Sequence, residues 1–390
     1  MKHVLLGALA CLLSACATDR PLDFACPPFD DFRIPIATTP GQSDQTVART
    51  RPSPLTDAIE QSFGRVSRDG VTAAVPGRPQ VLVLSGGGQW GAFGATFLQE
   101  WSARGSGDAA RPSAFDTVTG VSTGALQATY AFLGRDDDQK LVDAYTITSE
   151  KQLVDRHGSL FFVSHASMAD IKPLETYVRT NLRPLLERVA DAAQGGRQLF
   201  VGVVDGLDGR AYAIDLTEIA RRLSGAERET CYVGALLASS AVPVVFRQVT
   251  INGRPYLDGG VRHSVFITEV QQAAGEAASR RQIEGDLYIL MNGDLSPTSV
   301  PTLPAKLLPT LNRMRTIVFN QIELTSVFGT ASRYPGLRTR VATAAGNTCE
   351  TVSDEEAEIF DPKAMECLRA YGRERWKQGV PWSEYRVPQE

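Results

Sequence analysis

The chain has 390 residues, of which 43% are hydrophobic and 22% are charged, an ordinary globular composition. It is too apolar for a disordered chain and too mixed for a protein with many membrane spans. Lys and Arg total 40 against 44 Asp and Glu, a net charge of −4, so there is no basic excess for a nucleic-acid partner. Only four histidines are present, which limits any mechanism that needs one: His3, His157, His165 and His263.

The first residues have the pattern of a targeting segment. Lys2 precedes an apolar run over residues 4–13, which is too short to span a bilayer of about 30 Å but suits a signal-peptide core. Leu13-Ser14-Ala15-Cys16 follows and resembles the lipobox of bacterial lipoproteins, in which cleavage precedes a cysteine that is then diacylated. The alternative is an ordinary signal peptide or a buried strand. The pattern predicts a signal peptide over residues 1–15 and a lipid anchor at Cys16.

The lipobox resemblance also implies a location and a linker. A lipoprotein of this type is held in the bacterial cell envelope. Ala17 is not the Asp that is often linked to retention in the inner membrane, which favours the outer membrane. Seven of the 22 prolines fall within residues 17–54, and proline favours extended chain. We therefore expect an extended tether over residues 16–75.

Four cysteines remain beyond the anchor, and an even number permits disulfides in an oxidising compartment. Cys349 and Cys367 lie in one C-terminal segment and are the favoured pair, whereas Cys26 with Cys231 is a second option. The spacing lacks the close CxxC arrangement of a zinc site, so no metal site is expected.

From residue 80 onward, short apolar strands alternate with helical patterns. This alternation predicts an α/β fold with a mostly parallel central sheet flanked by helices. We expect one domain over residues 76–295 and a helical extension over residues 296–390 packed against it. The expected strands are 81–84, 115–119, 199–204, 246–251 and 286–291; the expected helices are 56–63, 125–133, 171–192, 216–223, 230–238 and 305–328, with another around residues 97–101.

The helix expected at residues 305–328 has an apolar stripe: Leu307, Leu311, Met314, Val318 and Ile322. Such spacing favours core packing, with membrane contact as the alternative. Five arginines add local positive charge, which suits either anionic head groups or a solvated face: Arg313, Arg315, Arg333, Arg338 and Arg340.

Gly120-Val121-Ser122-Thr123-Gly124 is a G-x-S-x-G sequence between an expected strand and an expected helix. The two glycines leave room for a sharp turn that exposes a strained nucleophilic serine. The N-terminus of the following helix would favour negative charge developing at that serine. The alternative is an ordinary strand-to-helix turn with an N-capping serine.

A glycine loop, Gly86-Gly87-Gly88-Gln89-Trp90-Gly91, follows the first strand of this region. Consecutive glycines let backbone N–H groups turn toward one anionic point, as an oxyanion hole requires. The same residues also satisfy G-x-G-x-x-G, the fingerprint of a dinucleotide site. A dinucleotide site would require an acidic residue at the end of the next strand, where this chain has the serine motif instead. No cofactor is expected.

Two more motifs complete the set. Asp258-Gly259-Gly260 places a carboxylate on a tight turn, which in isolation is usually just a turn. Upstream lies A-S-S-A-V-P at residues 238–243. The glycine loop, G-x-S-x-G, A-S-x-A-x-P and D-G-G, in this order, resemble the patatin-like phospholipase family. A strand, "LDGR" and a second strand over residues 197–215 extend the resemblance, which covers about residues 80 to 295.

The resemblance implies a lipid acyl hydrolase with a Ser–Asp dyad. On that basis Ser122 is the nucleophile, Asp258 is its base, and Gly86, Gly87 and Gly88 hold the oxyanion. The remaining motif glycines support these loops: Gly91, Gly120, Gly124, Gly259 and Gly260. The implied substrates are acyl esters of membrane phospholipids or lysophospholipids. The alternative is a catalytically silent lipoprotein of this fold that binds lipid or an envelope protein.

The chain departs from the family pattern at two positions. The family often has Asp before the glycines and Arg or Lys two positions after them, where this chain has Ser85 and Trp90. We therefore expect an oxyanion hole made of backbone amides alone. Other nearby residues are not expected to be catalytic: His263 as a polar loop residue, and His157 and His165 in structural or surface roles. Phe161, Phe162 and Met168 fit either an acyl-chain pocket or a core turn.

Overall fold

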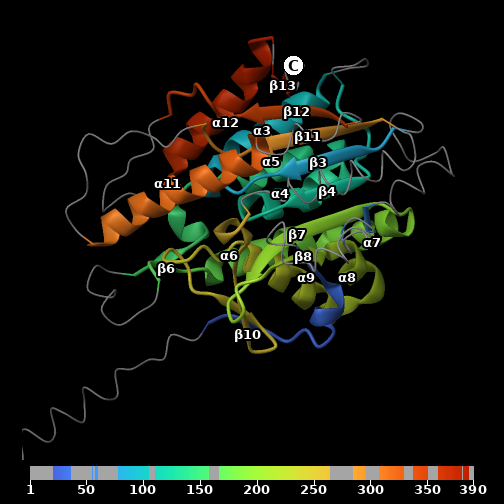
Figure 1. Ribbon diagram of the computed structural model, residues 1–390, viewed down its shortest axis with the longest axis vertical. Coiled ribbons are helices and arrows are strands. Elements are labelled where there is room, and N and C mark those ends of the chain that lie inside the picture. The colour runs from blue at the N-terminus through green and yellow to red at the C-terminus, as the bar shows by residue number, and fades with distance from the viewer. Residues whose placement is uncertain are drawn as a thin grey trace, which may run out of the picture.

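The computed structural model describes residues 21–36, 55, 58–59, 78–104, 110–157, 167–263, 284–295, 307–328, 337–349, 359–379 and 381–385 (Figure 1). The predicted signal peptide and Cys16 lie outside these residues, as do most of the expected 56–63 helix, Phe161, Phe162 and His165. Within the described part of the chain, no helix is long and apolar enough to cross a membrane.

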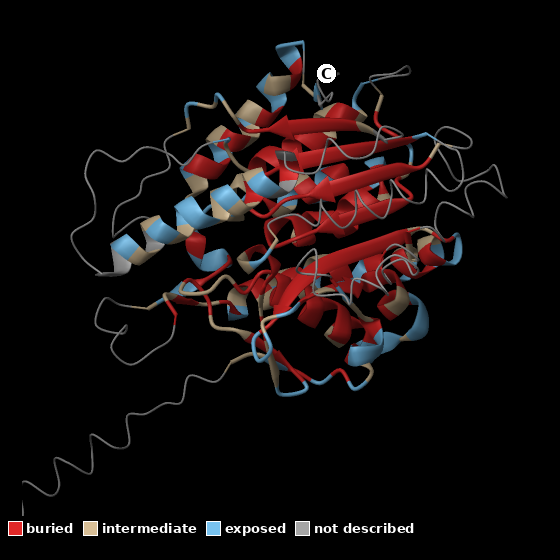
Figure 2. Ribbon diagram, in the orientation of Figure 1, coloured by how far each residue is buried: buried red, intermediate tan, exposed pale blue. Residues whose placement is uncertain are grey.

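Parallel strands form the centre of the sheet. β3 (Gln80–Leu84) pairs in parallel with β4 (Thr117–Gly120) and with β11 (Gly285–Met291), and β4 pairs in parallel with β7 (Gln198–Asp205). Every residue of these strands is buried, as expected for strands covered on both faces (Figure 2). Alternate residues of β3 enter two different hydrophobic clusters, one on each face of the sheet. The predicted mostly parallel α/β fold is confirmed.

Further strands extend the sheet on both sides, giving eleven among the described residues in the order β1-β9-β10-β7-β4-β3-β11-β12-β13, with β8 beside β7 and β2 beside β8. The outer strands are β1 (Asp23–Phe24), β2 (Arg33–Pro35), β8 (Ala211–Asp215), β9 (Val249–Ile251), β10 (Arg254–Asp258), β12 (Leu337–Thr343) and β13 (Ser383–Tyr385). A small separate pair joins β5 (Asp155–Arg156) to β6 (Ala169–Asp170).

We expected a helical C-terminal extension, but this part of the chain also contributes two strands to the sheet. β12 pairs in parallel with β11, and β13 pairs antiparallel with β12. Arginines interrupt the apolar pattern of β12 and concealed it. In the fold Arg338 and Arg340 both bind the carboxylate of Asp286 in β11, at 2.9 and 3.2 Å, so ion pairs across the two strands accommodate these charged side chains.

The expectation of an extended tether is wrong for residues 21–36. This stretch contains β1 (Asp23–Phe24), a 3-10 turn, η1 (Phe29–Phe32), and β2 (Arg33–Pro35), and Phe24, Phe29 and Phe32 are buried. A disulfide from Cys26 to Cys231 fixes it to α9 (Gly225–Ser239). Buried aromatic rings and a covalent bond outweigh the extended preference of the prolines. The Cys349–Cys367 disulfide is also present.

Helices cover both faces of the sheet. The larger hydrophobic cluster joins the sheet to α3 (Gly91–Ser102), α4 (Thr123–Leu133), α9 and α12 (Pro362–Lys377), with α12 packed along α3 (Figure 1). The expected 171–192 helix is divided into α6 (Lys172–Leu182), η6 (Arg183–Leu185) and α7 (Leu186–Gln194). Pro184 lacks the N–H that a continuous helix would use. The remaining helical segments are α5 (Asp138–Ala144), α8 (Leu216–Arg222), η2 (Gly88–Trp90), η3 (Arg135–Asp137), η4 (Glu150–Gln152) and η7 (Gly259–Val261).

The long helix α11 (Leu307–Phe328) lies on the surface, with most of its visible length exposed or half-buried (Figure 2). The prediction that the stripe with Met314 and Val318 forms core was wrong, because both side chains are exposed. The inward stripe instead consists of residues four positions apart, and it includes polar members: Arg315, Phe319, Glu323 and Val327. Because two of these four side chains are charged, the stripe does not show up as an apolar periodicity in the sequence.

Candidate active site

Ser122 occupies a strained turn between β4 and α4. Its φ is 55° and its ψ is −124°, in a region that residues with a side chain rarely adopt. A Cβ on Gly120 would lie 2.3 Å from the carbonyl oxygen of Gly124, and a Cβ on Gly124 would lie 2.4 Å from that of Leu84. The two glycines are therefore required by close backbone contact, as the G-x-S-x-G spacing predicts.

The A-S-S-A-V-P segment, which includes the last two residues of α9, holds this turn in place. The Ser122 N–H donates to both the carbonyl and the hydroxyl oxygen of Ser239, each at 3.1 Å. The Ser240 hydroxyl donates to the carbonyl oxygen of Ser122 at 3.4 Å. The N–H of Asp258 donates to the carbonyl oxygen of Ala241 at 3.0 Å. One segment thus positions both the serine and the aspartate.

Asp258 ends β10, which pairs with the same edge of β7 as β4 does, just beyond the end of β4, while β8 pairs with the other edge. The side chain is buried, and its Oδ1 accepts a hydrogen bond of 2.7 Å from the N–H of Gly260. A Cβ on Gly259 would lie 2.6 Å from the carbonyl oxygen of Gly202 in β7, so the first glycine of D-G-G lets this turn approach the sheet.

Burial raises the pKa of Asp258 to about 7, against opposing effects from Ser122, Gly260 and the positive charge of Arg315. The Ser122 hydroxyl is close enough to lower this pKa, yet Oδ2 of Asp258 accepts no hydrogen bond of ordinary geometry from the described residues. Such contacts are often long in a site without substrate. A carboxylate with a pKa near neutrality is well matched to removing a proton from a serine hydroxyl.

The glycine loop lies directly against the serine. A Cβ on Gly86 would be 3.4 Å from the Cβ of Ser122, and one on Gly87 would be 1.8 Å from the carbonyl oxygen of Asn292. Gly87 and Gly88 have φ values of 145° and 55°. The N–H groups of Gly86, Gly87 and Gly88 donate no backbone hydrogen bond to any residue that the structure describes. These amides are therefore available for an oxyanion.

A buried polar network supports the glycine loop from below. The Ser85 hydroxyl donates to the carbonyl oxygen of Gly86 at 2.7 Å and accepts from the N–H of Asn292 at 2.8 Å. The Asn292 side chain donates to Ser85 and to Gln127, and Gln127 donates to the carbonyl oxygen of Gly91, each at 2.8 Å. Ser85, at the position where the family often has Asp, is therefore a structural partner of the loop. No sequence motif marked Asn292 or Gln127.

Helix α11 contributes three residues that sequence reasoning did not place in the site. Burial lowers the pKa of Arg315, and the nearby Asp258 opposes that effect. The ring of Phe319 would be 3.1 Å from a Cβ on Gly260, so it packs on the D-G-G turn. Burial raises the pKa of Glu323 to about 7, and contact with the Ser85 hydroxyl opposes this shift. Their spacing of four residues, which places them on one side of the helix, is the feature of the sequence that could have indicated a shared inward face.

His263 follows the D-G-G turn, and its N–H donates to the carbonyl oxygen of Gly259 at 2.9 Å. Burial and the neighbouring Arg262 lower the pKa of His263 to about 4, so the imidazole is neutral at pH 7. Met168 is half-buried, and its N–H donates to the carbonyl oxygens of Val244 and Val245, which lie between α9 and β9. The other residues of the predicted acyl-chain pocket lie outside the described part of the chain.

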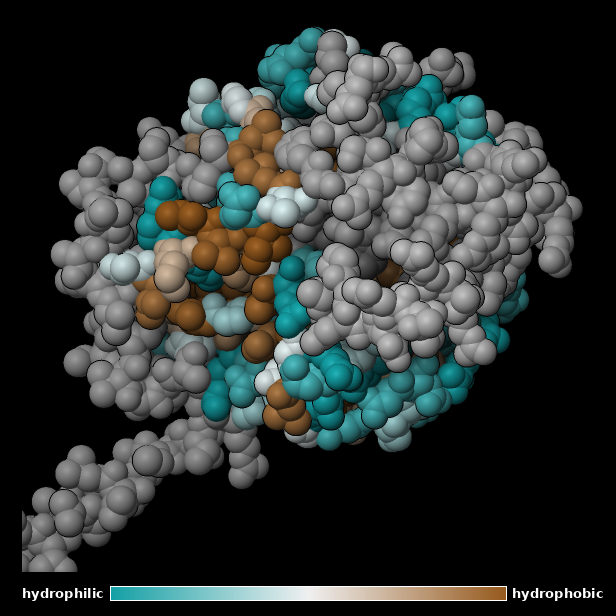
Figure 3. All heavy atoms as spheres, viewed as in Figure 1, coloured by the Kyte–Doolittle hydropathy of each residue, from teal (hydrophilic) through white to brown (hydrophobic). Residues whose placement is uncertain are grey.

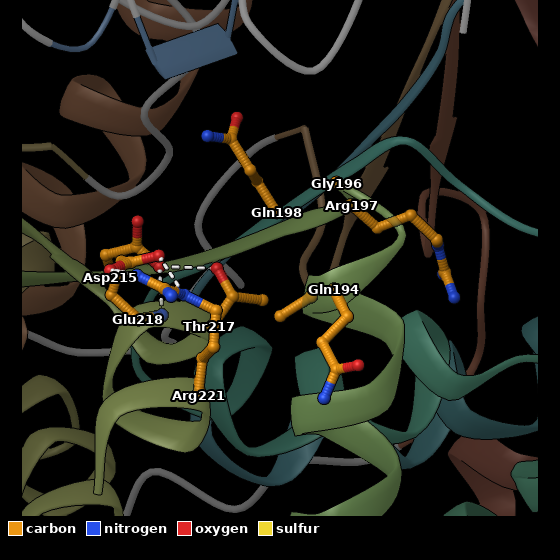
Figure 4. A pocket seen from close by; sticks show the side chains of 9 residues that line it. Gln194, Gly196, Arg197, Gln198, Asp215, Thr217, Glu218 and Arg221 are labelled. Carbon is orange, nitrogen blue, oxygen red and sulfur yellow. Dashed lines mark hydrogen bonds and ion pairs between the residues drawn. The ribbon is translucent and has the colours of Figure 1, made fainter. Parts of the chain in front are cut away.

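A cavity of about 650 Å³ lies elsewhere, at the amino end of β7 (Figure 4). Several of its polar groups already bind one another: the Asp215 carboxylate caps α8 through the N–H of Glu218 and accepts from Thr217, and Arg221 pairs with Glu218. Ser122, at the carboxyl end of β4, does not line it. This cavity is therefore not part of the candidate active site.

The site thus combines a serine in a tight strand-to-helix turn, a buried carboxylate, and a glycine loop whose amides donate no backbone hydrogen bond within the described residues, a combination that suits serine hydrolase chemistry. Residues 82–270 match the family model for patatin-like phospholipase, so the chain contains a patatin-like phospholipase domain, which supports a relationship to the lipid acyl hydrolases. No curated protein matches the chain.

Proposed function

We propose that this protein is a membrane-tethered serine hydrolase that cleaves fatty-acyl esters of phospholipids or lysophospholipids through Ser122 and Asp258. The observation that carries the proposal is the contact between a strained, buried Ser122 and an Asp258 whose pKa burial raises to about 7. The family match supports lipid acyl esters as the substrate class.

In the proposed first step, the Ser122 hydroxyl oxygen attacks the ester carbonyl carbon while its proton passes to the Asp258 carboxylate. The carbonyl oxygen gains negative charge and accepts hydrogen bonds from the free amides of Gly86, Gly87 and Gly88. The carbon–oxygen bond to the leaving alcohol then breaks, and Asp258 returns the proton to that alcohol. Ser122 is left esterified to the fatty acyl group.

The second step regenerates the enzyme. Water attacks the acyl carbonyl carbon, and Asp258 takes a proton from it. Collapse of the second tetrahedral intermediate breaks the bond to Ser122, whose oxygen recovers the proton from Asp258, and the fatty acid leaves. No histidine takes part in this sequence.

A fluorophosphonate probe, which reacts with activated serines, tests this proposal. We expect the wild-type protein to be labelled and to hydrolyse acyl esters, and Ser122→Ala and Asp258→Asn to do neither while remaining folded. Ser113→Ala, at an exposed serine outside the site, is the matched control and should be labelled normally. A folded wild-type protein that neither labels nor hydrolyses any phospholipid, lysophospholipid or short ester would favour a binding protein without turnover.

The tether is part of the same proposal and has its own test. If Cys16 carries the lipid, Cys16→Ser should move the protein from the membrane fraction to the soluble fraction, and separation of inner from outer membranes should place the wild type in the outer membrane. Unchanged fractionation of Cys16→Ser would rule out lipidation at this residue.

A further inference from the structure

The outer face of α11 carries a cluster of exposed apolar side chains. Met314, Ile317 and Val318 are 56%, 46% and 45% exposed, and their spacing of three and four residues places them on one side of the helix. Figure 3 shows a hydrophobic area over this helix, bordered by hydrophilic residues. Large apolar patches on a protein surface usually mark a place where something binds.

The same helix forms a wall of the proposed active site. Arg315, Phe319 and Glu323 point inward to Asp258, Gly260 and Ser85, on the side of α11 opposite the exposed cluster. A helix with its side chains is about 10 Å across, so the apolar face lies about one helix diameter from the catalytic groups. Whatever binds that face is held beside the site.

We propose that Met314, Ile317 and Val318 form a membrane-contact surface that places the active site against a lipid bilayer. The proposal rests on the proposed function, because acyl esters of phospholipids are presented to an enzyme mainly in a bilayer. An apolar helix face typically enters the boundary between head groups and acyl chains by about 5–10 Å, which is the depth at which ester carbonyls lie. The surface thus fits the substrate in chemistry and position.

A second copy of the chain is a weaker fit for this surface. A stable protein interface buries roughly 800 Å² on each partner, which is more than three half-exposed side chains supply. A bilayer has no such requirement, since each apolar side chain inserts on its own.

Tryptophan fluorescence locates the surface directly. We would place a tryptophan at Val318→Trp and, as the matched control, at Leu207→Trp; Leu207 is 70% exposed on the turn between β7 and β8. Both variants also carry Ser122→Ala, and both are mixed with vesicles of phosphatidylglycerol and phosphatidylethanolamine with brominated acyl chains. We expect quenching of at least half of the added fluorescence at position 318 and none at position 207. Equal quenching at the two positions, or none at either, would overturn the proposal.

The Ser122→Ala background separates this test from the proposed function. Because these proteins have no nucleophile, quenching reports contact with lipid whether or not the wild type turns lipid over. An inactive wild type combined with quenching at position 318 would reject the hydrolase and keep the membrane surface. An active wild type without quenching at position 318 would keep the hydrolase and reject the membrane-contact surface.

Kinetics give a second measurement. In the double variant Ile317→Glu, Val318→Glu, the ratio of the rate on phospholipid vesicles to the rate on a soluble short-chain ester should fall at least tenfold. Leu207→Glu should change that ratio by less than twofold. An unchanged ratio in the double variant argues against lipid contact. A dimer that the double variant dissociates, with that ratio unchanged, would assign the face to a second copy instead.

Discussion

Asp258 is expected to make the folded protein less stable as the pH rises to neutrality. Burial raises its pKa to about 7 in the folded state, against about 3.9 for an aspartate in an unfolded chain. Between these values the folded protein binds a proton that the unfolded chain has released, so folding is favoured most below about pH 4 and stability is lost up to about pH 7. Three pKa units correspond to about 4 kcal/mol, a large share of a typical 5–15 kcal/mol.

Asp258→Asn removes this effect with little change in shape. The side-chain oxygen of asparagine still accepts the hydrogen bond from the N–H of Gly260, but the group no longer titrates. We therefore expect the free energy of unfolding of the variant, relative to the wild type, to rise by about 4 kcal/mol between pH 4 and pH 8. Denaturant unfolding at a series of pH values measures this difference, because other buried carboxylates, such as Glu323, contribute equally to both proteins.

Ser122→Ala is the control, because it abolishes turnover but keeps the titrating carboxylate. It should follow the pH dependence of the wild type or exceed it slightly, since the Ser122 hydroxyl lowers the pKa of Asp258. In the wild type, kcat/KM should rise with pH with a midpoint near 7, as Asp258 loses its proton and becomes a base. Parallel stability profiles for the wild type and Asp258→Asn would refute the raised pKa.

Three more outcomes are expected at the site. Gly87→Ala should reduce kcat at least a hundredfold, because its Cβ would lie 1.8 Å from the carbonyl oxygen of Asn292, beside the glycine loop. Gly209→Ala is the control, because Gly209 also has a positive φ but has open space around it. Equal losses of kcat in the two variants would contradict this reasoning. Arg315→Gln should move the midpoint of the kcat/KM profile to higher pH, since Arg315 lowers the pKa of Asp258, whereas Arg315→Lys should restore it. An unmoved midpoint would show that the two charges do not interact. His263→Ala should lower kcat less than tenfold, and a larger loss in a folded variant would argue for a triad.

The fold centre was predictable because its strands are continuous apolar runs. β3 reads Gln-Val-Leu-Val-Leu and is buried on both faces, and the glycines of the serine turn mark where the next strand ends. The periphery was harder to predict. Arg338 and Arg340 pair with Asp286 across β12 and β11, and a local pattern contains no information about a partner more than fifty residues away.

The same distinction holds at the site. Ser122, Asp258 and the three loop glycines stand in local motifs whose backbone requirements are visible in the sequence, and the structure brings them together. Asn292 and Gln127 support the glycine loop through side-chain hydrogen bonds between distant segments. An Asn or Gln has many uses, so nothing local distinguishes those that hold a loop.

Helix α11 lies beyond the family match, which ends at residue 270, yet its side chains lie against the candidate site. Burial is the main cause of the raised pKa of Asp258, and Phe319 of α11 packs on the turn that carries this carboxylate. Arg315 of the same helix acts in the opposite direction by stabilising the charged form. Side chains of α11 therefore form part of the surroundings that set the pKa of Asp258. A domain defined by its motifs alone would contain Ser122 and Asp258, the proposed nucleophile and base, but would lack part of the surroundings that set the pKa of Asp258 near neutrality.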